Sequence, residues 1–462
     1  MSRFLLLSAS MGAGHNAACT ELARRLDAAG HESMELDVLR LLPGPIGAGL
    51  RGFYHLVIRR APFVYSGIYS AFFQPGDGPR PGSTPLAALA EGRLLDAVAH
   101  SRADAVVSIF HLAAQVTGRA RERGRLAVPC ATLVTDFAVH RQWLQPGNDL
   151  NLCLTGAAAE EARHALGRPS AVYGPLVPEA FHPHPDGEQQ WRERFAAALE
   201  GASRGGGEYT DGSRGAGGGA GRGRGRGRGR PTVLLSAGAW GAGTGFTRTA
   251  ETLRLAGYHP VVLCGRDERL RTRLMRVEGT TALGWVGDMP GLLAASDALL
   301  DNAAGQTALQ ALAVGVPVIG WRPIPGHGIA GVRRMAELGL SDYAANEQEL
   351  VRALGRLVPD GPERRSRVAN GRALLDTDVV APLEAMVEGT EGRMRGEGAA
   401  GKGAGTASDD GAGSARMARL RRTGEDVVGH VGDDVLGNMG EVGAGRTDGV
   451  GQMGEPGEPL AG

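Results

Sequence analysis

A histidine near the amino terminus lies in a segment whose residue types suit proton transfer beside a bound ligand. His15 follows Gly12 and Gly14 in the segment SASMGAGHN, between a short apolar run and a stretch with helical periodicity. Glycines let the backbone approach a ligand closely, and the amino terminus of the following helix favours negative charge. An imidazole at this place can take a proton from a hydroxyl near neutral pH. A purely structural role in the helix start is the alternative.

This glycine loop does not fit the common nucleotide-binding fingerprints. No Gly-Lys-Ser/Thr follows it, so it is not a Walker loop, and its spacing departs from GxGxxG. Asp37 nevertheless lies about 20 residues further on, where an acidic residue of a dinucleotide-binding fold would bond a ribose. A nicotinamide-dependent (NAD-type) oxidoreductase that uses Gly12–His15 therefore stays open as an alternative.

A second group of polar residues follows the apolar run 131–134. Asp136 and His140 lie in the segment VTDFAVH, just beyond that predicted strand. Ligands of open α/β sheets bind at the carboxyl ends of strands. Asp136 could orient His15 or receive its charge, and His140 could bind an acceptor or a phosphate. An Asx-type turn at Asp136 is the structural alternative.

A third group is suited to holding a diphosphate. The segment DNAAGQT (301–307) lies between an apolar run and a helical stretch, so its amides can meet negative charge at a helix amino terminus. Thr307 adds a hydroxyl, and Gln310 lies one helical turn on, where it could meet a ribose. The loop GWRPIPGHG carries His327 near the same crevice, and the backbone beside Val286 could read a base edge. Ordinary turn chemistry is the alternative for these loops.

Short apolar strands that alternate with helices must position these groups. Strands are predicted at residues 4–8, 32–39, 105–110, 131–134, 150–154, 232–237, 259–264, 298–300 and 316–320. Helices are predicted at 17–29, 246–256, 267–277 and 307–313. Because the pattern restarts after a Gly/Arg-rich insert, the sequence predicts an α/β protein with two doubly wound domains.

Composition places the domain boundaries and excludes some partners. We expect an N-terminal domain over residues 1–180, a linker with a disordered insert over 181–230, a second domain over 231–395 and a disordered tail over 396–462. Basic and acidic residues balance at 50 each, so no global charge favours nucleic acid. The 4 cysteines stand singly, without the spacing of metal ligands, which fits a reducing, cytosolic compartment.

Together these segments resemble the monogalactosyldiacylglycerol synthase and processive diacylglycerol glucosyltransferase family, which is GT28-like. SASMGAGHNAA is similar to the family's Gly-x-Gly-His loop, and VTDFAVHRQW to its Thr-Asp-x-x-x-His-x-x-Trp segment. LGWVGDMPGLLAASD and AAGQTALQALAVGVPVI are similar to its donor-domain signature. The resemblance covers residues 3–357 apart from the insert, with these segments in the family's order.

The resemblance implies a GT-B fold, in which two Rossmann-like domains face a cleft. It implies an inverting glycosyltransferase that moves a hexose from a UDP-sugar to a diacylglycerol-type lipid in glycolipid biosynthesis. No metal and no cofactor are expected beyond the UDP-sugar as co-substrate. His15 becomes the expected catalytic base, with Asp136 as its catalytic partner. The implied acceptor-binding residues are Gly12, Gly14, Asn16 and His140. The implied donor-binding residues are Gly238, Val286, Ala304, Gly305, Gln306, Thr307, Gln310 and His327.

The chain departs from the family pattern on the donor side. Gln310 stands where the family has a glutamate, and Asn302 stands where it has a lysine. Ala304 stands in place of the first glycine of the family's Gly-Gly pair. Gly328 stands where the family has a glutamate, and Gly331 where it has an asparagine. A catalytically weakened member that binds nucleotide-sugar or lipid is therefore a further alternative.

The segment 46–73 carries many of the chain's aromatic residues together with basic ones. Its apolar and basic residues are Phe53, Tyr54, Leu56, Val57, Ile58, Phe63, Tyr65, Tyr69, Phe72, Phe73, Arg51, Arg59 and Arg60. Such a mixture suits contact with an anionic membrane surface, whereas a helical hairpin with an apolar core side is the alternative. No apolar run reaches the length of a bilayer span. We therefore expect a cytoplasmic protein, peripheral on the inner face of the cell membrane.

Overall fold

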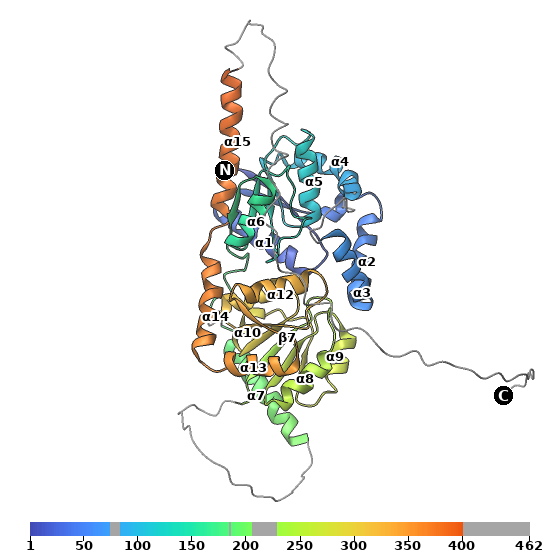
Figure 1. The fold of residues 1–462 in the computed structure, drawn as a ribbon, viewed down its shortest axis with the longest axis vertical. Coiled ribbons are helices and arrows are strands. Elements are labelled where there is room, and N and C mark those ends of the chain that lie inside the picture. Colours follow the sequence, from blue (N-terminus) through green and yellow to red (C-terminus); the bar gives the residue numbers. More distant parts are fainter. Residues whose placement is uncertain (74–83, 184–185, 206–228, 401–462) are drawn as a thin grey trace, which may run out of the picture. The chain divides into compact units, whose positions relative to one another are not determined.

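The computed structural model describes residues 1–73, 84–183, 186–205 and 229–400 (Figure 1). Met1–Ala399 form one compact unit, which contains two six-stranded sheets. Most of the predicted Gly/Arg-rich insert and nearly all of the predicted tail lie outside the described residues, and the domain boundaries given above stay predictions. We call the part built on the first sheet the N-terminal lobe and the part built on the second sheet the C-terminal lobe.

The N-terminal lobe alternates strands with helices. Its strands are β1 (Arg3–Ser8), β2 (Glu32–Asp37), β3 (Ala105–Ser108), β4 (Cys130–Leu133), β5 (Leu150–Cys153) and β6 (Ser170–Val172). Its helices are α1 (Ala13–Ala28), the 3-10 helix η1 (Val38–Leu41), α2 (Ile46–Arg60), α3 (Pro62–Phe72), α4 (Thr84–Ser101), α5 (His111–Glu122) and α6 (Gly156–Leu166).

The C-terminal lobe repeats the pattern. Its strands are β7 (Thr232–Ser236), β8 (His259–Leu263), β9 (Thr281–Leu283), β10 (Ala298–Asp301), β11 (Val318–Trp321) and β12 (Ser341–Ala344). The helices of this part of the chain are α7 (Glu188–Gly205), α8 (Phe246–Leu255), α9 (Glu268–Leu274), α10 (Met289–Ala294), α11 (Gln306–Val314), α12 (His327–Glu337), α13 (Glu347–Leu357), α14 (Pro362–Ala373), the 3-10 helix η2 (Leu374–Asp376) and α15 (Val380–Ala400).

Both sheets are parallel and both change winding direction at one point. The strand orders are β2-β1-β3-β4-β5-β6 and β12-β11-β10-β7-β8-β9. The strand order reverses its direction between β1 and β3 in the first sheet, and between β7 and β10 in the second. Ligands of doubly wound sheets bind outside the carboxyl ends of the strands at such points. The prediction of two doubly wound domains is therefore confirmed, and the topology already indicates where a site should lie.

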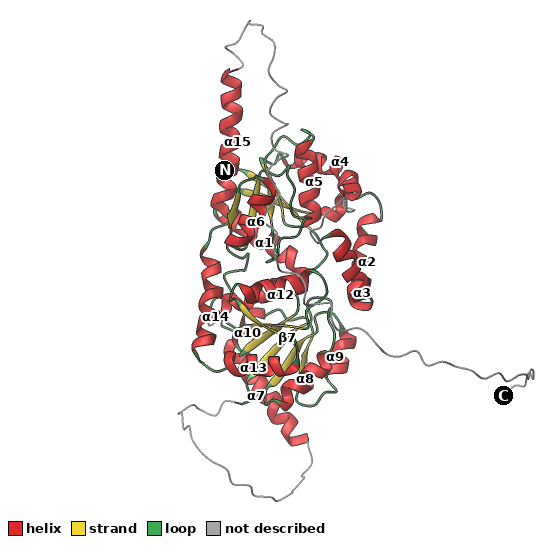
Figure 2. Ribbon diagram, viewed as in Figure 1, coloured by secondary structure: helices red, strands yellow, loops and turns green. Residues whose placement is uncertain are grey.

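Each sheet is covered by helices on both faces (Figure 2), which explains the unbroken apolar runs of its strands. In β1, Phe4 and Leu6 pack into one apolar cluster. Leu5 and Leu7 pack into a second cluster on the other face of the same strand. A strand buried on both faces has no polar face to show, so it reads in the sequence as a continuous hydrophobic stretch.

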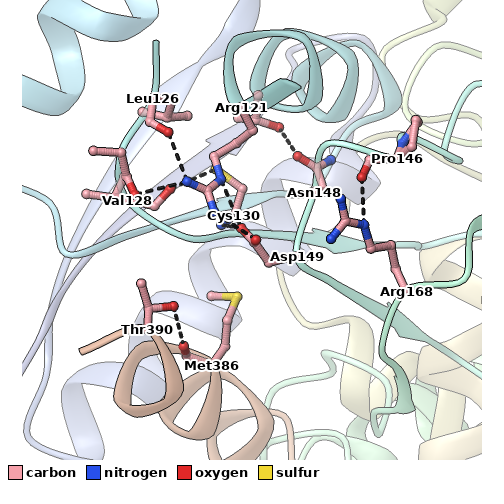
Figure 3. A network of polar contacts seen from close by, with 12 residues as sticks. Arg121, Leu126, Val128, Cys130, Pro146, Asn148, Asp149, Arg168, Met386 and Thr390 are labelled. Atoms are coloured by element: carbon pink, nitrogen blue, oxygen red, sulfur yellow. Dashed lines mark hydrogen bonds and ion pairs between the residues drawn. The ribbon is translucent and has the colours of Figure 1, made fainter. Parts of the chain in front are cut away.

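Charged groups fix the strand that precedes the Asp136 segment. The guanidinium of Arg121, in α5, donates from Nη2 and Nε to the carboxylate of Asp149, at 2.8 and 3.1 Å, and from Nη1 to the carbonyl of Leu126 at 3.0 Å (Figure 3). Asp149 also accepts from the backbone amide of Cys130 at 2.8 Å. The two-pronged pair ties α5 to the starts of β4 and β5, and so fixes where the carboxyl end of β4 points.

Two chain crossings join the lobes, and they lie against each other. The segment after β6 crosses to the C-terminal lobe, and the segment before α15 crosses back. The amide of Gly174, in the first crossing, donates to the carbonyl of Thr377, in the second, at 2.9 Å. The returning helix α15 then packs on the N-terminal lobe, where Glu384 lies 2.8 Å from Nε2 of His31. Adjacent crossings of this kind are suited to hinge motion of the lobes.

The predicted strands are confirmed to within one or two residues where they were strongly apolar, but predicted strand 32–39 ends at Asp37. Three strands were not predicted: β6, β9 and β12 have three or four residues each and are in part polar, so they give no periodic signal. The first helix begins at Ala13 instead of residue 17. The first turn contains Gly14 and His15 and has no apolar periodicity, so the sequence pattern gave no signal for it.

Candidate functional site

One cavity of about 700 Å³ is lined by residues of both lobes. It lies at the carboxyl ends of the strands, where the winding of each sheet changes direction. Of the sequence-predicted site residues it is lined by Gly12, Gly14, His15, Asp136, His140, Gly238, Val286, Ala304, Gly305, Gln306, Thr307, Gln310 and His327. The exception is Asn16, whose side chain is exposed and accepts a hydrogen bond from the hydroxyl of Ser8 at 3.3 Å. The two predicted binding regions therefore form a single site.

His15 lies in the first turn of α1, with one ring nitrogen committed. Its Nδ1 lies 3.1 Å from the carbonyl of Ile109 and 3.4 Å from the hydroxyl of Thr135. Since a carbonyl only accepts, Nδ1 carries the proton, and Nε2 is the basic nitrogen. Among the described residues, none hydrogen-bonds Nε2. Phe110 supports the ring edge-on, with centroids 5.0 Å apart.

Burial lowers the pKa of His15, and the charge of Asp136 partly opposes this effect. The imidazole is therefore neutral at neutral pH and can accept a proton through Nε2. This combination of a fixed tautomer and a free basic nitrogen is what a general base needs.

Asp136 is held by its own segment. Its Oδ2 accepts a hydrogen bond from Nε1 of Trp143 at 2.9 Å and lies 3.3 Å from Nε2 of His140. Burial alone would raise the pKa of Asp136, but the hydrogen bond and charge of His140 outweigh it, and the pKa lies well below its usual range. His15 is thus oriented by the hydrogen bond that its Nδ1 donates to the carbonyl of Ile109. Asp136 acts on His15 through its negative charge.

The start of α11 offers backbone amides to the cavity. Oδ2 of Asp301 accepts from the amides of Ala303 and Ala304, so those two amides are already engaged. Gly305 is the amino-terminal cap and has no side-chain cap, and α11 begins at Gln306. The amides of Gly305, Gln306 and Thr307 are therefore the ones that can hold an anion. Ala304 was predicted to bind the donor, but its amide is engaged by Asp301, so we assign Ala304 a role in the shape of the loop.

The predicted acceptor loop and the predicted diphosphate loop touch each other. A Cβ built on Gly14 would lie 3.5 Å from Cβ of Gln306. The side chain of Gln306 donates to the carbonyl of Leu176, in the first lobe crossing, at 2.7 Å. Its amide group therefore ties the lobes together, and only its backbone faces a ligand. The base-bearing helix and the anion-binding helix start lie side by side.

The second glycine-rich loop is fixed against the diphosphate loop. Gly238 and Gly243 have φ of +64° and +121°, which favours glycine at both positions. Nδ2 of Asn302 donates to the carbonyl of Ala242 at 3.0 Å. Asn302, which departs from the family's lysine, is thus a structural link between two cavity-lining loops.

Two aromatic residues border the Val286 region. The guanidinium of Arg266 lies 4.8 Å from the ring centroid of Trp285 and 5.6 Å from that of Trp240. Asp288, just beyond, caps α10 through Gly291 and accepts from Trp191 at 2.9 Å. Trp240 and Trp285 line the cavity and were not among the predicted site residues.

Two departures from the family pattern have a packing reason. A Cβ on Gly331 would lie 2.8 Å from Cβ of Ala304, so a larger residue at 331 has no room beside that methyl group. A Cβ on Gly328 would lie 2.5 Å from Cγ1 of Ile324 and 2.8 Å from the carbonyl oxygen of Asn302. Both glycines lie in α12, and the tight space beside them accounts for small residues where the family has larger polar ones.

Ala304 has a φ of +52°, a left-handed conformation that costs an L-residue about 1–2 kcal/mol. Its neighbour Ala303 does not share that conformation. Both Ala304→Gly and Ala303→Gly remove one methyl group and loosen the unfolded chain, but only the first relieves strain. We expect Ala304→Gly to be about 1 kcal/mol more stable than Ala303→Gly in urea unfolding. Equal losses in the two variants would contradict the strained loop.

The residues of the dinucleotide alternative are otherwise engaged. Asp37 accepts from the hydroxyl of Ser10 at 2.6 Å and from the amide of Leu39 at 2.9 Å. Its carboxylate therefore links the first glycine loop to η1. Among the described residues, no three His, Cys, Asp or Glu side chains are placed to hold one metal ion. The absence of a metal or cofactor requirement stays a prediction.

The hairpin of α2 and α3 divides between the cavity and solvent. Tyr65 and Tyr69, expected at a membrane surface, are buried and line the cavity. Leu56 and Phe63 are instead 53% and 77% exposed, and Phe53 lines the cavity while remaining 51% exposed. Among the described residues, no helix is long and apolar enough to cross a membrane.

Two parallel α/β lobes that share a cavity at their switch points form the GT-B fold expected from the sequence. Residues 15–174 match the family model described as monogalactosyldiacylglycerol (MGDG) synthase. The chain is 23% identical over 248 residues to a processive diacylglycerol beta-glucosyltransferase of Staphylococcus carnosus, which covers 52% of this chain and 56% of the relative. The resemblance to the MGDG synthase and diacylglycerol glucosyltransferase family is thereby confirmed.

A processive diacylglycerol beta-glucosyltransferase of Bacillus pumilus is 27% identical over 148 residues, covering 31% of this chain and 39% of the relative. The chain thus spans about half the length, or less, of these curated relatives. Among solved structures, the Anabaena protein HepE in complex with UDP-glucose aligns with a TM-score of 0.47 at 14% identity, over 85% of this chain and 100% of that chain.

Proposed function

We propose that this protein is an inverting glycosyltransferase that moves a hexose from a UDP-sugar to a diacylglycerol-type lipid. One observation carries the proposal: the free Nε2 of His15 and the open amides of α11 belong to the same cavity, one from each lobe. The family match of residues 15–174 and the diacylglycerol glucosyltransferase relatives support the substrate class.

The reaction would be a single displacement at the anomeric carbon. The lipid hydroxyl forms the new C–O bond, Nε2 of His15 takes the hydroxyl proton, and the bond from the anomeric carbon to the diphosphate oxygen breaks. The amides of Gly305–Thr307 and the hydroxyl of Thr307 stabilise the departing negative charge. Asp136 stabilises the imidazolium that forms on His15. Attack from the face opposite the leaving group inverts the configuration.

The division of labour between the lobes follows from their contents. The N-terminal lobe contributes the base and an apolar wall, with Leu50, Val57 and Ile68 of the hairpin among its members. The C-terminal lobe contributes amides and, near Val286 and Trp285, surfaces suited to a planar base. Hinge motion at the adjacent crossings would exclude water from the reacting atoms.

The direct test is a transfer assay with the full chain. Vesicles that contain diacylglycerol are incubated with UDP-glucose or UDP-galactose, and the lipid extract is analysed by mass spectrometry. The proposal predicts a product heavier by one hexose and release of UDP in equal amount. Binding of a UDP-sugar without any product, across donors and lipids, would instead support a non-catalytic binding protein.

We further propose that the exposed side chains of the hairpin insert into an anionic membrane surface at the cytoplasmic face. Replacing Phe53, Leu56 and Phe63 by Ser should weaken binding to phosphatidylglycerol vesicles by at least about tenfold, because each loses roughly 1 kcal/mol or more of apolar burial. Flotation or sedimentation with vesicles measures the effect.

A matched control lies on the C-terminal lobe. Leu255 and Met275 are 77% and 63% exposed, far along the chain from the hairpin. Replacing both by Ser should leave vesicle binding unchanged. If this control weakens binding as much as the hairpin variant does, or if the hairpin variant binds normally, the hairpin is not the membrane contact.

A further inference from the structure

A hydrogen bond joins the acceptor hairpin to the donor lobe at the cavity wall. The hydroxyl of Tyr65, in α3, lies 2.7 Å from Nδ1 of His327, at the first position of α12. The two rings meet edge-on, with centroids 5.8 Å apart and planes at 90°. This contact spans 262 residues of sequence and links the two lobes directly.

The backbone beside His327 is shaped to receive the same helix. Gly326 has a φ of +78°, and a Cβ built on it would lie 2.6 Å from Cγ of Tyr69. Only a glycine lets α3 approach this closely. The packing of Tyr69 on Gly326 therefore sets the distance at which Tyr65 reaches His327.

The hydrogen bond leaves one nitrogen of His327 for a ligand. With Nδ1 engaged by Tyr65, either tautomer presents Nε2, as a donor or as an acceptor. Among the described residues, none hydrogen-bonds that nitrogen. Burial lowers the pKa of His327, so the ring is neutral and can bond a hydroxyl without a net charge.

The position of His327 selects the part of the donor that it can meet. His327 follows β11, the neighbour of β10, whose carboxyl end leads into the amides proposed to hold the diphosphate. His327 lines the same cavity as Asp136 and His15, and both act on it electrostatically. His327 therefore shares one cavity with the diphosphate amides and the proposed base, and the transferred sugar must lie in that cavity.

We propose that Tyr65 is a positioning residue that holds His327 so that Nε2 bonds a hydroxyl of the donor sugar. The acceptor hairpin thereby completes the donor-sugar site, and donor recognition depends on the lobes being together. This inference rests on the proposed function, since it assumes a nucleotide-sugar in the cavity.

The test compares UDP-glucose with UDP, by calorimetry, on the full chain. Tyr65→Phe keeps the ring and removes the hydroxyl, so it should weaken UDP-glucose binding roughly fivefold, the size of one neutral hydrogen bond, and leave UDP binding within about twofold. Tyr258→Phe is the matched control, because Tyr258 lies outside the cavity lining and the described residues give its hydroxyl no hydrogen-bond partner. It should leave both affinities within about twofold.

A double-mutant cycle separates positioning from general loosening. In a His327→Ala background, Tyr65→Phe should change UDP-glucose binding by less than about twofold, because its partner is gone. An undiminished loss in that background, an equal loss with Tyr258→Phe, or normal UDP-glucose binding by Tyr65→Phe would overturn this inference and leave the proposed function standing. A wild-type protein that binds neither UDP nor UDP-glucose would remove the proposed function as well.

Discussion

Replacing His15 with Ala should lower the rate of glycosyl transfer about 10²- to 10⁴-fold, the usual range for loss of a general base. Donor binding should be unaffected, because the C-terminal lobe holds the diphosphate and the uracil ring of the donor. Turnover is measured with diacylglycerol vesicles, and UDP-sugar affinity by calorimetry. His164→Ala, an exposed histidine on α6, is the control and should retain full activity.

The pH profile gives an independent check on the same residue. Because burial lowers the pKa of His15 below its ordinary value of 6.5, the base stays neutral at and somewhat below that pH. Activity should fall only when the pH drops through this lowered pKa, since protonation removes the lone pair of Nε2. A His15→Ala variant with unchanged turnover, or an activity loss that begins above pH 6.5, would contradict His15 as the base.

Asp136→Asn should have the second-largest effect, a loss in turnover on the order of 10²-fold. Asparagine preserves the size of the side chain and can still accept from Trp143, but it cannot stabilise the imidazolium of His15. Removing the negative charge also lowers the pKa of His15 further. The acid limb of the pH profile should therefore move to lower pH while the plateau drops.

Trp143→Phe offers the matched comparison for Asp136. That variant removes one hydrogen bond to the carboxylate and keeps its charge, so its loss in turnover should be much smaller, about tenfold or less. A shift of the acid limb to higher pH in Asp136→Asn would show that the carboxylate does not act on the base. Similar losses in the two variants would assign Asp136 a structural role.

The strands and the loops that follow them could be predicted well from the sequence. Runs such as Phe4–Leu7 had to be buried strands, and the glycine loops after them marked the carboxyl ends at which a doubly wound sheet binds ligands. Because every strongly apolar strand was recognised, the residues that follow those strands were placed at one cavity. Asn16 was misplaced because its side chain is exposed on α1, outside the cavity that its neighbour His15 lines.

What the sequence could not supply were contacts between residues far apart in the chain. The carbonyl of Ile109 orients His15 across 94 residues, and Tyr65 meets His327 across 262. No periodicity or spacing encodes such pairs. The hairpin was misjudged for a related reason: its aromatic residues look alike in sequence, yet Tyr65 and Tyr69 face the cavity whereas Phe63 faces solvent.

The departures from the family pattern also changed meaning once their neighbours were known. Ala304 and Gly331 lie in contact, so one small residue accompanies the other. Asn302 bonds the carbonyl of Ala242 and joins two loops. Residues that read individually as lost donor contacts thus have structural contacts of their own, and His327 is a polar side chain of the same region that lines the cavity.

The most direct test of the account is a crystal structure of the full chain with UDP bound. We expect the diphosphate at the amides of Gly305–Thr307 and the uracil ring beside Val286. Nε2 of His15 should lie across the cavity from the terminal phosphate. A diphosphate bound instead at Gly12–Gly14, or a His15 ring turned away from the nucleotide, would contradict the assignment of donor and base to opposite lobes.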